Sequence, residues 1–213
     1  MNSKMSGDNY NEGYWERGIG SNYHSYGNDP GWPIVASVMS DYVSPGSVVY
    51  EIACAKGYLV KSLVRSGFNA YGIDISDYAI SKAESDVFSR LVVGNAVSLP
   101  WEDETADAVV SMEFFEHVPE DEVDAVLAEK IRVLKPGGAI AMKIGIVIPS
   151  DHPFAGQDDH DVTHYTVQDR DWWESKFSGA GLVKDQGFQD KFDAAFANRD
   201  WVGRFFVWRK QNA

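Results

Sequence analysis

Acidic and histidine side chains gather in the second half of this 213-residue chain, in a pattern that could do acid–base or metal chemistry. Glu113, Glu116 and His117 form an E-x-x-E-H motif, and His164 follows within a polar segment. Imidazole changes its charge near neutral pH, so we expect His117 and His164 to be candidate general bases. Carboxylates and imidazoles together also suit magnesium, manganese, iron or zinc. The segment before His164 holds further such groups, at Asp151, His152, Asp158, Asp159, His160 and Asp161.

These observations give two interpretations of the same residues. In the first, Glu113, Glu116, His117 and His164 are candidate ligands of a divalent metal. In the second, the acids and histidines hydrogen-bond to one another and shape a pocket, or serve as acid–base groups without a metal. The sequence leaves both open.

A turn of small residues could bind a ligand through its backbone. The sequence EIACAKG begins at Glu51 and places Ala53, Ala55 and Gly57 at alternate positions, between an apolar run and the start of a helix. Small side chains let a ligand approach the backbone beside the N-terminus of that helix. A dinucleotide fingerprint would need a glycine where Tyr58 stands, so the spacing does not favour NAD or FAD.

Two further features decide what this turn could hold. Asp74 ends the next predicted strand about 20 residues on, where a carboxylate can accept both hydroxyls of a ribose.

Ala53 and Ala55 carry a methyl group where glycine would let a ligand pass closely. An alanine with positive φ is strained, so we predict that both have negative φ at little cost. The alternative is that the methyl groups weaken ligand binding or leave the site inactive.

Hydrophobic patterning predicts the elements that place these residues. Apolar strands that alternate with helices favour an α/β fold, in which a mostly parallel sheet is covered by helices on both faces. An insertion of roughly 15 residues separates the last two strands, longer than a usual hairpin loop. The predicted strands are 48–52, 70–74, 91–93, 108–111, 139–147, 182–188 and 204–208, and the predicted helices are 33–42, 57–66, 76–88, 119–134 and 168–180.

Five motifs in order resemble those of the Rossmann-like, class I methyltransferases that use S-adenosylmethionine. The turn from Glu51 is similar to their acidic-G-x-G-x-G motif, with alanine for glycine twice, and Asp74 stands where they have a ribose-binding acid. The other three motifs are G-N-A-x-x-L-P from Gly94, with Asn95 where aspartate is usual, D-A-V-V-S followed by E-H-V, and L-K-P-G-G from Leu134. The resemblance covers about residues 45–150.

This resemblance implies a three-layer sandwich with a mostly parallel seven-stranded sheet and an antiparallel last strand. E-x-x-E-H with a later histidine also resembles the metal site of small-RNA 2′-O-methyltransferases and of some ubiquinone-pathway O-methyltransferases. The implied contacts to S-adenosylmethionine come from Glu51, Ala53, Ala55, Gly57, Asp74, Asn95, Ala96 and Glu113.

The ends of the chain suggest how a site could be closed. Residues 1–32 form a glycine-rich, aromatic arm without an apolar period, which we expect to pack as a lid, because disordered tails are usually poor in aromatics. Residues 33–213 are expected to form a single methyltransferase domain. Within it, residues 149–173 are expected to close over the acceptor, since His164-Tyr165-Thr166 resembles small-molecule methyltransferases of glycan and secondary metabolism. Of Trp172 and Trp173, we expect one to be ordinary core.

Composition narrows the partners. The net charge of −13 repels phosphate backbones and anionic lipid, which disfavours general nucleic-acid or membrane binding. There is no long apolar run and no apolar signal-peptide core, and a single cysteine fits a reducing cytoplasm. The sequence does not indicate an oligomeric state.

The function expected from these observations is methyl transfer from S-adenosylmethionine to a hydroxyl or amine of a small molecule, such as a glycan or secondary-metabolite precursor. A hydroxyl acceptor would need His117 or His164 as a base, whereas a neutral amine would need none. One alternative is a non-catalytic S-adenosylmethionine-binding or regulatory protein. A second is a metal-assisted RNA 2′-O-methyltransferase.

Overall fold

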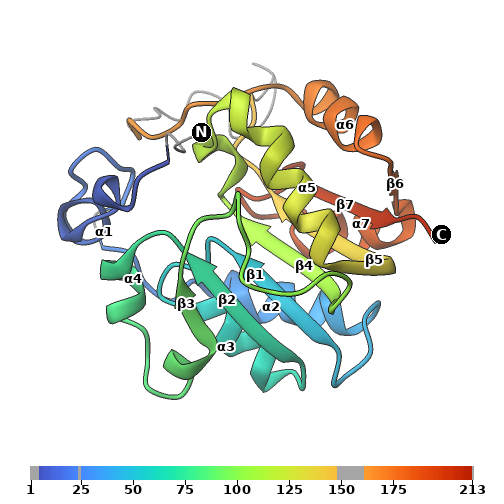
Figure 1. The fold of residues 1–213 in the computed structure, drawn as a ribbon, viewed down its shortest axis with the longest axis horizontal. Helices are drawn as coiled ribbons and strands as arrows, with labels where there is room; N and C mark the ends of the chain where they lie inside the picture. Colours follow the sequence, from blue (N-terminus) through green and yellow to red (C-terminus); the bar gives the residue numbers. More distant parts are fainter. Residues whose placement is uncertain (1–4, 24, 148–160, 213) are drawn as a thin grey trace.

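The computed structural model describes residues 5–23, 25–147 and 161–212. Its centre is a seven-stranded sheet with the strand order β3-β2-β1-β4-β5-β7-β6 (Figure 1). Neighbouring strands pair in parallel from β3 to β5, and β7 pairs antiparallel with both β5 and β6, so the predicted fold class is confirmed. The strands are β1 (Val48–Ile52), β2 (Asn69–Asp74), β3 (Leu91–Val93), β4 (Ala106–Met112), β5 (Leu134–Lys143), β6 (Leu182–Lys184) and β7 (Phe205–Lys210).

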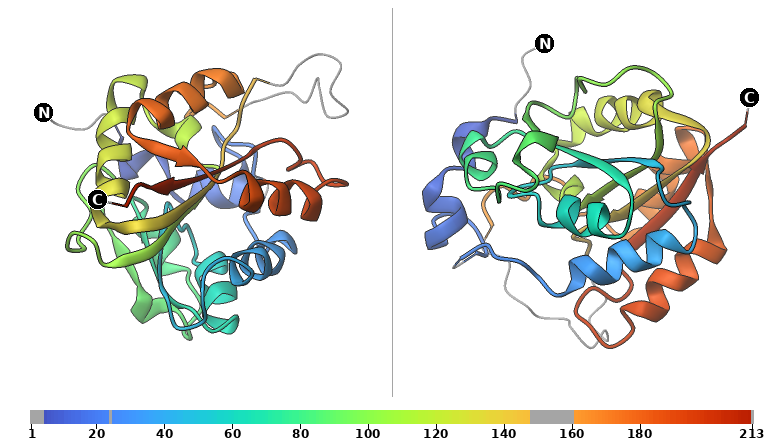
Figure 2. Two further views of the ribbon diagram at one scale, coloured as in Figure 1. Left: turned by 90° about the vertical axis from the view of Figure 1, so that its right-hand side faces the viewer. Right: turned by 90° about the horizontal axis from the view of Figure 1, so that it is seen from below.

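Helices cover both faces of the sheet, as the two turned views show (Figure 2). One face packs against α2, α3 and α7 in a core cluster, and the other packs against α5 and α6 in a second cluster. Alternation along β1 explains the division, since Val49 faces the first cluster while Tyr50 and Ile52 face the second. The helices are α1 (Glu12–Arg17), α2 (Gly31–Ser40), α3 (Tyr58–Arg65), α4 (Asp77–Ser81), α5 (Val123–Val133), α6 (Arg170–Gly179) and α7 (Gln186–Ala195), with 3-10 turns at Gly7–Asn9, Phe88–Arg90, Phe115–His117 and Glu120–Glu122.

Three predicted elements differ from the structure. The predicted strand 182–188 ends at Lys184, because Asp185 caps α7 through a bond from the Phe188 N–H, and this helix extends into the first half of the predicted insertion. The predicted helix 76–88 ends at Ser81, since the residues up to 86 are mostly exposed and bury little apolar surface. Strand β5 begins at Leu134 and ends at Lys143 rather than spanning 139–147.

The amino-terminal arm packs onto the body beside α4, at the left of Figure 1. It contains a short helix, α1, which the sequence pattern did not predict, and Asn11 caps its N-terminus. Tyr14 and Trp15 are buried in a cluster with Ala55 and Ala79 of the body. The expectation that the arm packs against the body is therefore met in its described residues. Trp32 belongs instead to α2 and its core cluster.

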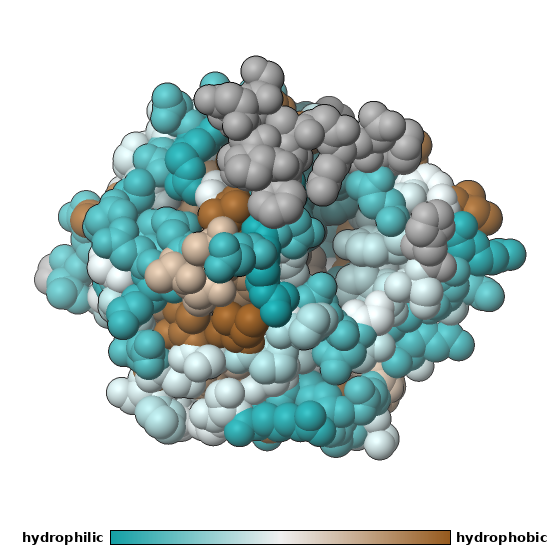
Figure 3. Space-filling view, turned by 180° about the vertical axis from the view of Figure 1, so that it is seen from behind, coloured by the Kyte–Doolittle hydropathy of each residue, from teal (hydrophilic) through white to brown (hydrophobic). Residues whose placement is uncertain are grey.

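The hydropathy of one face can be followed in a space-filling view. Seen from behind, most of this face is hydrophilic, with limited apolar areas (Figure 3). In the part of the chain that the structure describes, no helix is both long and apolar enough to cross a membrane.

Candidate functional site

A pocket opens at the carboxyl ends of β1, β2, β3 and β4, beside the point where the strand order reverses around β1. In open α/β sheets this crevice is where ligands bind. The pocket contains about 670 Å³ of empty space, part of it open to solvent. Its walls come from Ile52, Ala53, Ala55, Ile73, Asp74, Ile75, Gly94, Asn95, Ala96, Met112, Glu113, Phe114 and His117, and from Met5, Tyr10, Tyr14, Trp15, Tyr23 and Tyr26 of the arm.

The turn after β1 has left-handed backbone at alternate positions. The φ angles are 63° at Ala53, 49° at Ala55 and 75° at Gly57. The predicted negative φ of the two alanines is therefore wrong. The small-x-small-x-small pattern marks positions that need positive φ, and alanine here occupies them at a cost of roughly 1–2 kcal/mol each. A side chain at position 57 would also meet Leu91, since a Cβ there would lie 2.7 Å from Leu91 Cδ1.

Asp74 links this turn to the end of β2. One carboxylate oxygen accepts a hydrogen bond from the Ala55 N–H at 2.7 Å and the other accepts one from the Ser76 N–H at 2.8 Å. Burial raises the pKa of Asp74 to about 6, although these backbone donors favour the charged form. Each carboxylate oxygen retains a second lone pair for a ligand hydroxyl. Asp74 thus combines a fixed position, exposure to the pocket and acceptor capacity.

Other predicted cofactor residues have different positions. Asn95 and Ala96 line the pocket, and Asn95 fixes its own loop by accepting from the Val97 N–H at 3.1 Å. Glu51 is buried beneath the turn with a strongly raised pKa caused by burial, and neither it nor Gly57 is among the described residues that line the pocket. Gly57 shapes the turn through its left-handed backbone, whereas the buried Glu51 Oε2 has no hydrogen-bond partner among the described residues.

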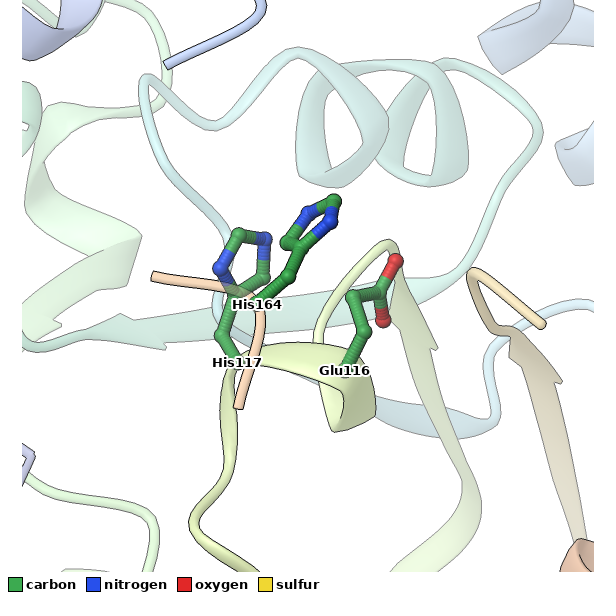
Figure 4. Close-up of side chains that lie close together, drawn as sticks. All are labelled: Glu116, His117 and His164. Carbon is green, nitrogen blue, oxygen red and sulfur yellow. The ribbon is translucent and has the colours of Figure 1, made fainter. Parts of the chain in front are cut away.

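Glu113 reaches the pocket but not the histidine cluster. Its backbone is left-handed, with φ of 50°, and its carboxylate forms an ion pair with buried Lys143 of β5. Of the four predicted metal ligands, the structure brings together the other three, Glu116, His117 and His164, whose ligand atoms lie within 4.8 Å of one another (Figure 4).

Glu116 contributes a buried acid to this cluster. Its Oε1 accepts a hydrogen bond from the Gly145 N–H at 2.8 Å, whereas Oε2 has no hydrogen-bond partner among the described residues. Burial raises the pKa of Glu116 to about 7. The ring of His164 packs edge-on against that of His117, with centroids 4.6 Å apart. An imidazole pair beside a carboxylate is a donor set suited to zinc or iron.

His117 is the member of the cluster that lines the pocket. Its Nδ1 lies 2.8 Å from the Thr163 hydroxyl, and that hydroxyl donates to Asp161 at 2.6 Å. Asp161 also accepts from the hydroxyl of Tyr14, in the arm, at 2.7 Å. Sequence reasoning identified His117 and Asp161 but missed Thr163 and the role of Tyr14. Asp151, His152, Asp158, Asp159 and His160 lie outside the described residues.

The arm forms the aromatic wall of the pocket. Tyr14 packs edge-on against Tyr10, Trp15 and Tyr23, with ring centroids 5.0 to 5.8 Å apart. The Trp15 indole N–H donates to Ser76 at 3.1 Å, beside Asp74.

Of the tryptophans in α6, Trp173 is fully buried in the core, as expected for one of the pair, and Trp172 lies by a groove between α5 and α6.

Known proteins resemble part of this chain in sequence. Residues 50–142 match a family model described as a methyltransferase domain. A 2-methyl-6-phytyl-1,4-hydroquinone methyltransferase of Synechocystis is 34% identical over 107 residues, which are 48% of this chain and 33% of the relative. A tRNA (carboxymethyluridine(34)-5-O)-methyltransferase of Arabidopsis thaliana is 33% identical over 114 residues, 53% of this chain and 27% of the relative. The chain spans less than two thirds of the length of the curated relatives it matches.

Solved structures share the fold. The protein bound to the Trm112 methyltransferase activator of Haloferax volcanii superposes with a TM-score of 0.65 at 20% identity, covering 85% of this chain and 90% of that one. Phosphoethanolamine N-methyltransferase 2 of Haemonchus contortus, in complex with S-adenosyl-L-methionine, has a TM-score of 0.60 at 16% identity, covering 85% and 53%.

The sheet order, the turn after β1 and the acid that ends β2 are those of a Rossmann-like α/β fold. The residues that match the methyltransferase-domain model, 50–142, lie within that fold and make up less than half of the chain. This part of the chain is similar to methyltransferase domains, and one structural neighbour is a methyltransferase in complex with S-adenosyl-L-methionine.

Proposed function

We propose that this protein transfers the methyl group of S-adenosylmethionine to a hydroxyl of a small molecule held under the aromatic arm. The observation that carries the proposal is Asp74, fixed by two backbone N–H groups at the edge of a pocket that also contains His117. In this assignment Asp74 accepts the ribose hydroxyls, the loop at Asn95 and Ala96 borders the adenine, and the turn at Ala53 and Ala55 faces the methionine portion.

The chemistry needs alignment more than activation. The acceptor oxygen forms a bond to the methyl carbon while the carbon–sulfur bond breaks, and the bonding pair stays on sulfur, giving S-adenosylhomocysteine. The methyl group is already activated by the sulfonium, so most of the catalysis is positioning. The hydroxyl proton passes to His117, which lines the pocket. An amine acceptor would not need this step.

A small acceptor suits the site. The arm covers the pocket with aromatic side chains, and the net charge of −13 opposes association with a phosphate backbone. The proposed acceptor, a small molecule, therefore differs from the tRNA named for one relative. Buried Cys54 as a free thiol suits a reducing cytoplasm, where we place the protein.

Titration calorimetry with S-adenosylhomocysteine tests the proposal, followed by assays of S-adenosylhomocysteine formation with hydroxyl and amine acceptors. We expect saturable binding of S-adenosylhomocysteine and none of NAD. Binding of NAD without S-adenosylhomocysteine would contradict the assignment of the pocket. Donor binding with no turnover on any acceptor would instead favour a regulatory protein that binds S-adenosylmethionine.

The arm serves as a lid in this proposal. It buries Tyr14 and Trp15 against the body while their neighbours face the pocket, so closure would exclude water from the reacting groups. Hydrogen exchange across residues 10–32 should slow when S-adenosylhomocysteine is added. Deletion of residues 1–28 should lower turnover far more than thermal stability. Equal hydrogen exchange of the arm with and without S-adenosylhomocysteine would mean that the arm only packs against the body and is not a lid.

A second candidate function is metal-assisted methyl transfer. Glu116, His117 and His164 converge, and the buried Glu116 Oε2 has no hydrogen-bond partner among the described residues. A divalent metal there would lower the pKa of an acceptor hydroxyl. Elemental analysis of purified protein, after incubation with zinc, iron or magnesium, should find a metal in the wild type and not in Glu116→Gln. Metal-free protein with unchanged activity in chelator would leave His117 as the base.

A further inference from the structure

A chain of hydrogen bonds joins the arm to the imidazole in the pocket. Tyr14 contacts Asp161, Asp161 contacts Thr163 and Thr163 contacts His117, through distances of 2.7, 2.6 and 2.8 Å. The four residues come from α1, from the segment before α6 and from the turn after β4. All four side chains are buried. We call this set the relay.

The direction of each bond in the relay follows from counting hydrogens. Thr163 has one hydroxyl hydrogen, and the carboxylate of Asp161 at 2.6 Å can only accept it. The Thr163 oxygen must therefore accept from His117, which places a hydrogen on Nδ1. In a neutral imidazole the other nitrogen, Nε2, then carries the lone pair. A base needs that lone pair, so the relay selects the competent tautomer.

The arm helps to hold the acid at the centre of the relay. Asp161 accepts from the N–H and the hydroxyl of Thr163 with one oxygen, and from Tyr14 with the other. A second link joins the same segments, because the Val162 N–H donates to the Gly20 carbonyl at 3.2 Å. Tyr14 is itself fixed, since its carbonyl accepts from the Ser21 hydroxyl at 2.6 Å.

We propose that Tyr14 is a positioning residue: through Asp161 and Thr163 it fixes the tautomer and orientation of His117, so closing the arm also prepares the site. The inference rests on the proposed function for its catalytic meaning. Tyr14 lines the pocket together with Tyr10 and Trp15, and a ligand that orders the arm therefore acts on His117 as well. The arm then does two things at once, because it excludes water and completes the hydrogen-bonded support of the base.

The test measures the tautomer of the His117 imidazole directly. Two-dimensional ¹H–¹⁵N correlation spectra of histidine-labelled protein with S-adenosylhomocysteine report which ring nitrogen carries hydrogen, and His117→Gln assigns the signal. We expect the wild type to hold the Nδ1–H tautomer. Tyr14→Phe, Asp161→Asn and Thr163→Val should give mixed tautomers, while Thr163→Ser, which keeps the hydroxyl, restores the wild-type spectrum.

A matched control comes from the same arm. Tyr23→Phe also removes a hydroxyl from a ring that lines the pocket, but Tyr23 is outside the relay, so its spectrum should keep the wild-type tautomer of His117. A wild-type Nε2–H tautomer, or a Tyr14→Phe spectrum equal to wild type, overturns the inference. In turnover assays we expect kcat of Tyr14→Phe to fall about tenfold, part of what a general base contributes.

The spectra separate this inference from the proposed function. If the tautomer depends on Tyr14 but methyl transfer does not depend on His117, the relay stands and the base assignment fails. If methyl transfer needs His117 while Tyr14→Phe leaves both tautomer and kcat unchanged, the base assignment stands and the relay fails.

Discussion

The two walls of the pocket are built by different means. The strand-end wall at β1, β2 and β4 is joined by main-chain hydrogen bonds between neighbouring segments, such as those from the Cys54 N–H to the Ile73 carbonyl and from the Gly94 N–H to the Asp74 carbonyl. The wall at His117 also has main-chain bonds, such as those from the Tyr165 and Thr166 N–H groups to the Glu116 carbonyl, but it adds side-chain links between segments far apart in the sequence, as Tyr14 and Asp161 show.

In the proposed function, the strand-end wall holds the cofactor and the wall at His117 holds the acceptor, and this difference suits those two tasks. A main-chain scaffold accepts many side chains without changing shape, so it suits a cofactor that every member of a family binds. A side-chain scaffold changes with each substitution, so it suits an acceptor that differs between members. Relatives that act on a hydroquinone and on tRNA are in keeping with this division.

The largest expected effect is a loss of turnover when His117 is replaced, with little change in cofactor affinity. Replacing His117 by Gln should lower kcat by about 10²- to 10⁴-fold, the usual contribution of a general base, because no group would take the acceptor proton. The affinity for S-adenosylhomocysteine, measured by calorimetry, should change little. Full activity in His117→Gln would mean that the acceptor is an amine or that another group is the base.

The second effect is a pH dependence at the strand-end wall. Burial raises the pKa of Asp74 from its ordinary 3.8 to about 6. The folded protein therefore holds this proton more tightly than the unfolded chain does. The stabilisation is complete below pH 3.8 and is lost as the pH rises through 6, on the order of 3 kcal/mol. Denaturant unfolding of wild type and Asp74→Asn between pH 4 and 7 measures it by difference; parallel curves would contradict the buried position.

The third effect is the affinity for the cofactor. Asp74→Ala should weaken binding of S-adenosylhomocysteine by about 1–3 kcal/mol, the scale of a lost hydrogen bond to a charged group. A fair comparison is Glu129→Ala, which removes an acid that also accepts a backbone N–H but lies outside the pocket. Equal affinity in wild type and Asp74→Ala, measured by calorimetry, would remove Asp74 from the ribose.

The smallest effect concerns the two alanines with left-handed backbone. Ala53→Gly and Ala55→Gly should each relieve strain, with a net gain of at most about 1 kcal/mol in the free energy of unfolding, because glycine also gains entropy in the unfolded chain. Both residues line the pocket, so cofactor affinity should rise as well. A loss of stability in both variants, seen by thermal melting, would mean that their methyl groups pack more favourably than the backbone is strained.

The sequence predicted the strand-end wall well because its signals are local. Apolar runs gave β1 to β4, and the spacing from Glu51 to Asp74 placed the acid beside the turn. Helix α7 was missed although Phe188, Phe192 and Phe196 recur at the helical interval, because the apolar start of the segment favoured a strand.

The other wall could be predicted only as a list of residues. His117 stood out by its chemistry, but its partners could not, since Tyr14 and Asp161 are 147 residues apart and no periodicity links them. The sign of φ at Ala53 and Ala55 was also misjudged. Alanine usually has negative φ, which is why negative values were predicted. The backbone path of the turn requires positive φ at these two positions, whatever residue occupies them.

A crystal structure with S-adenosylhomocysteine tests the central claim most directly. The account predicts ribose hydroxyls within hydrogen-bond distance of Asp74, the sulfur directed toward His117 and the arm closed with Tyr14 on Asp161. A ligand bound elsewhere, or a ribose that does not reach Asp74, would contradict it.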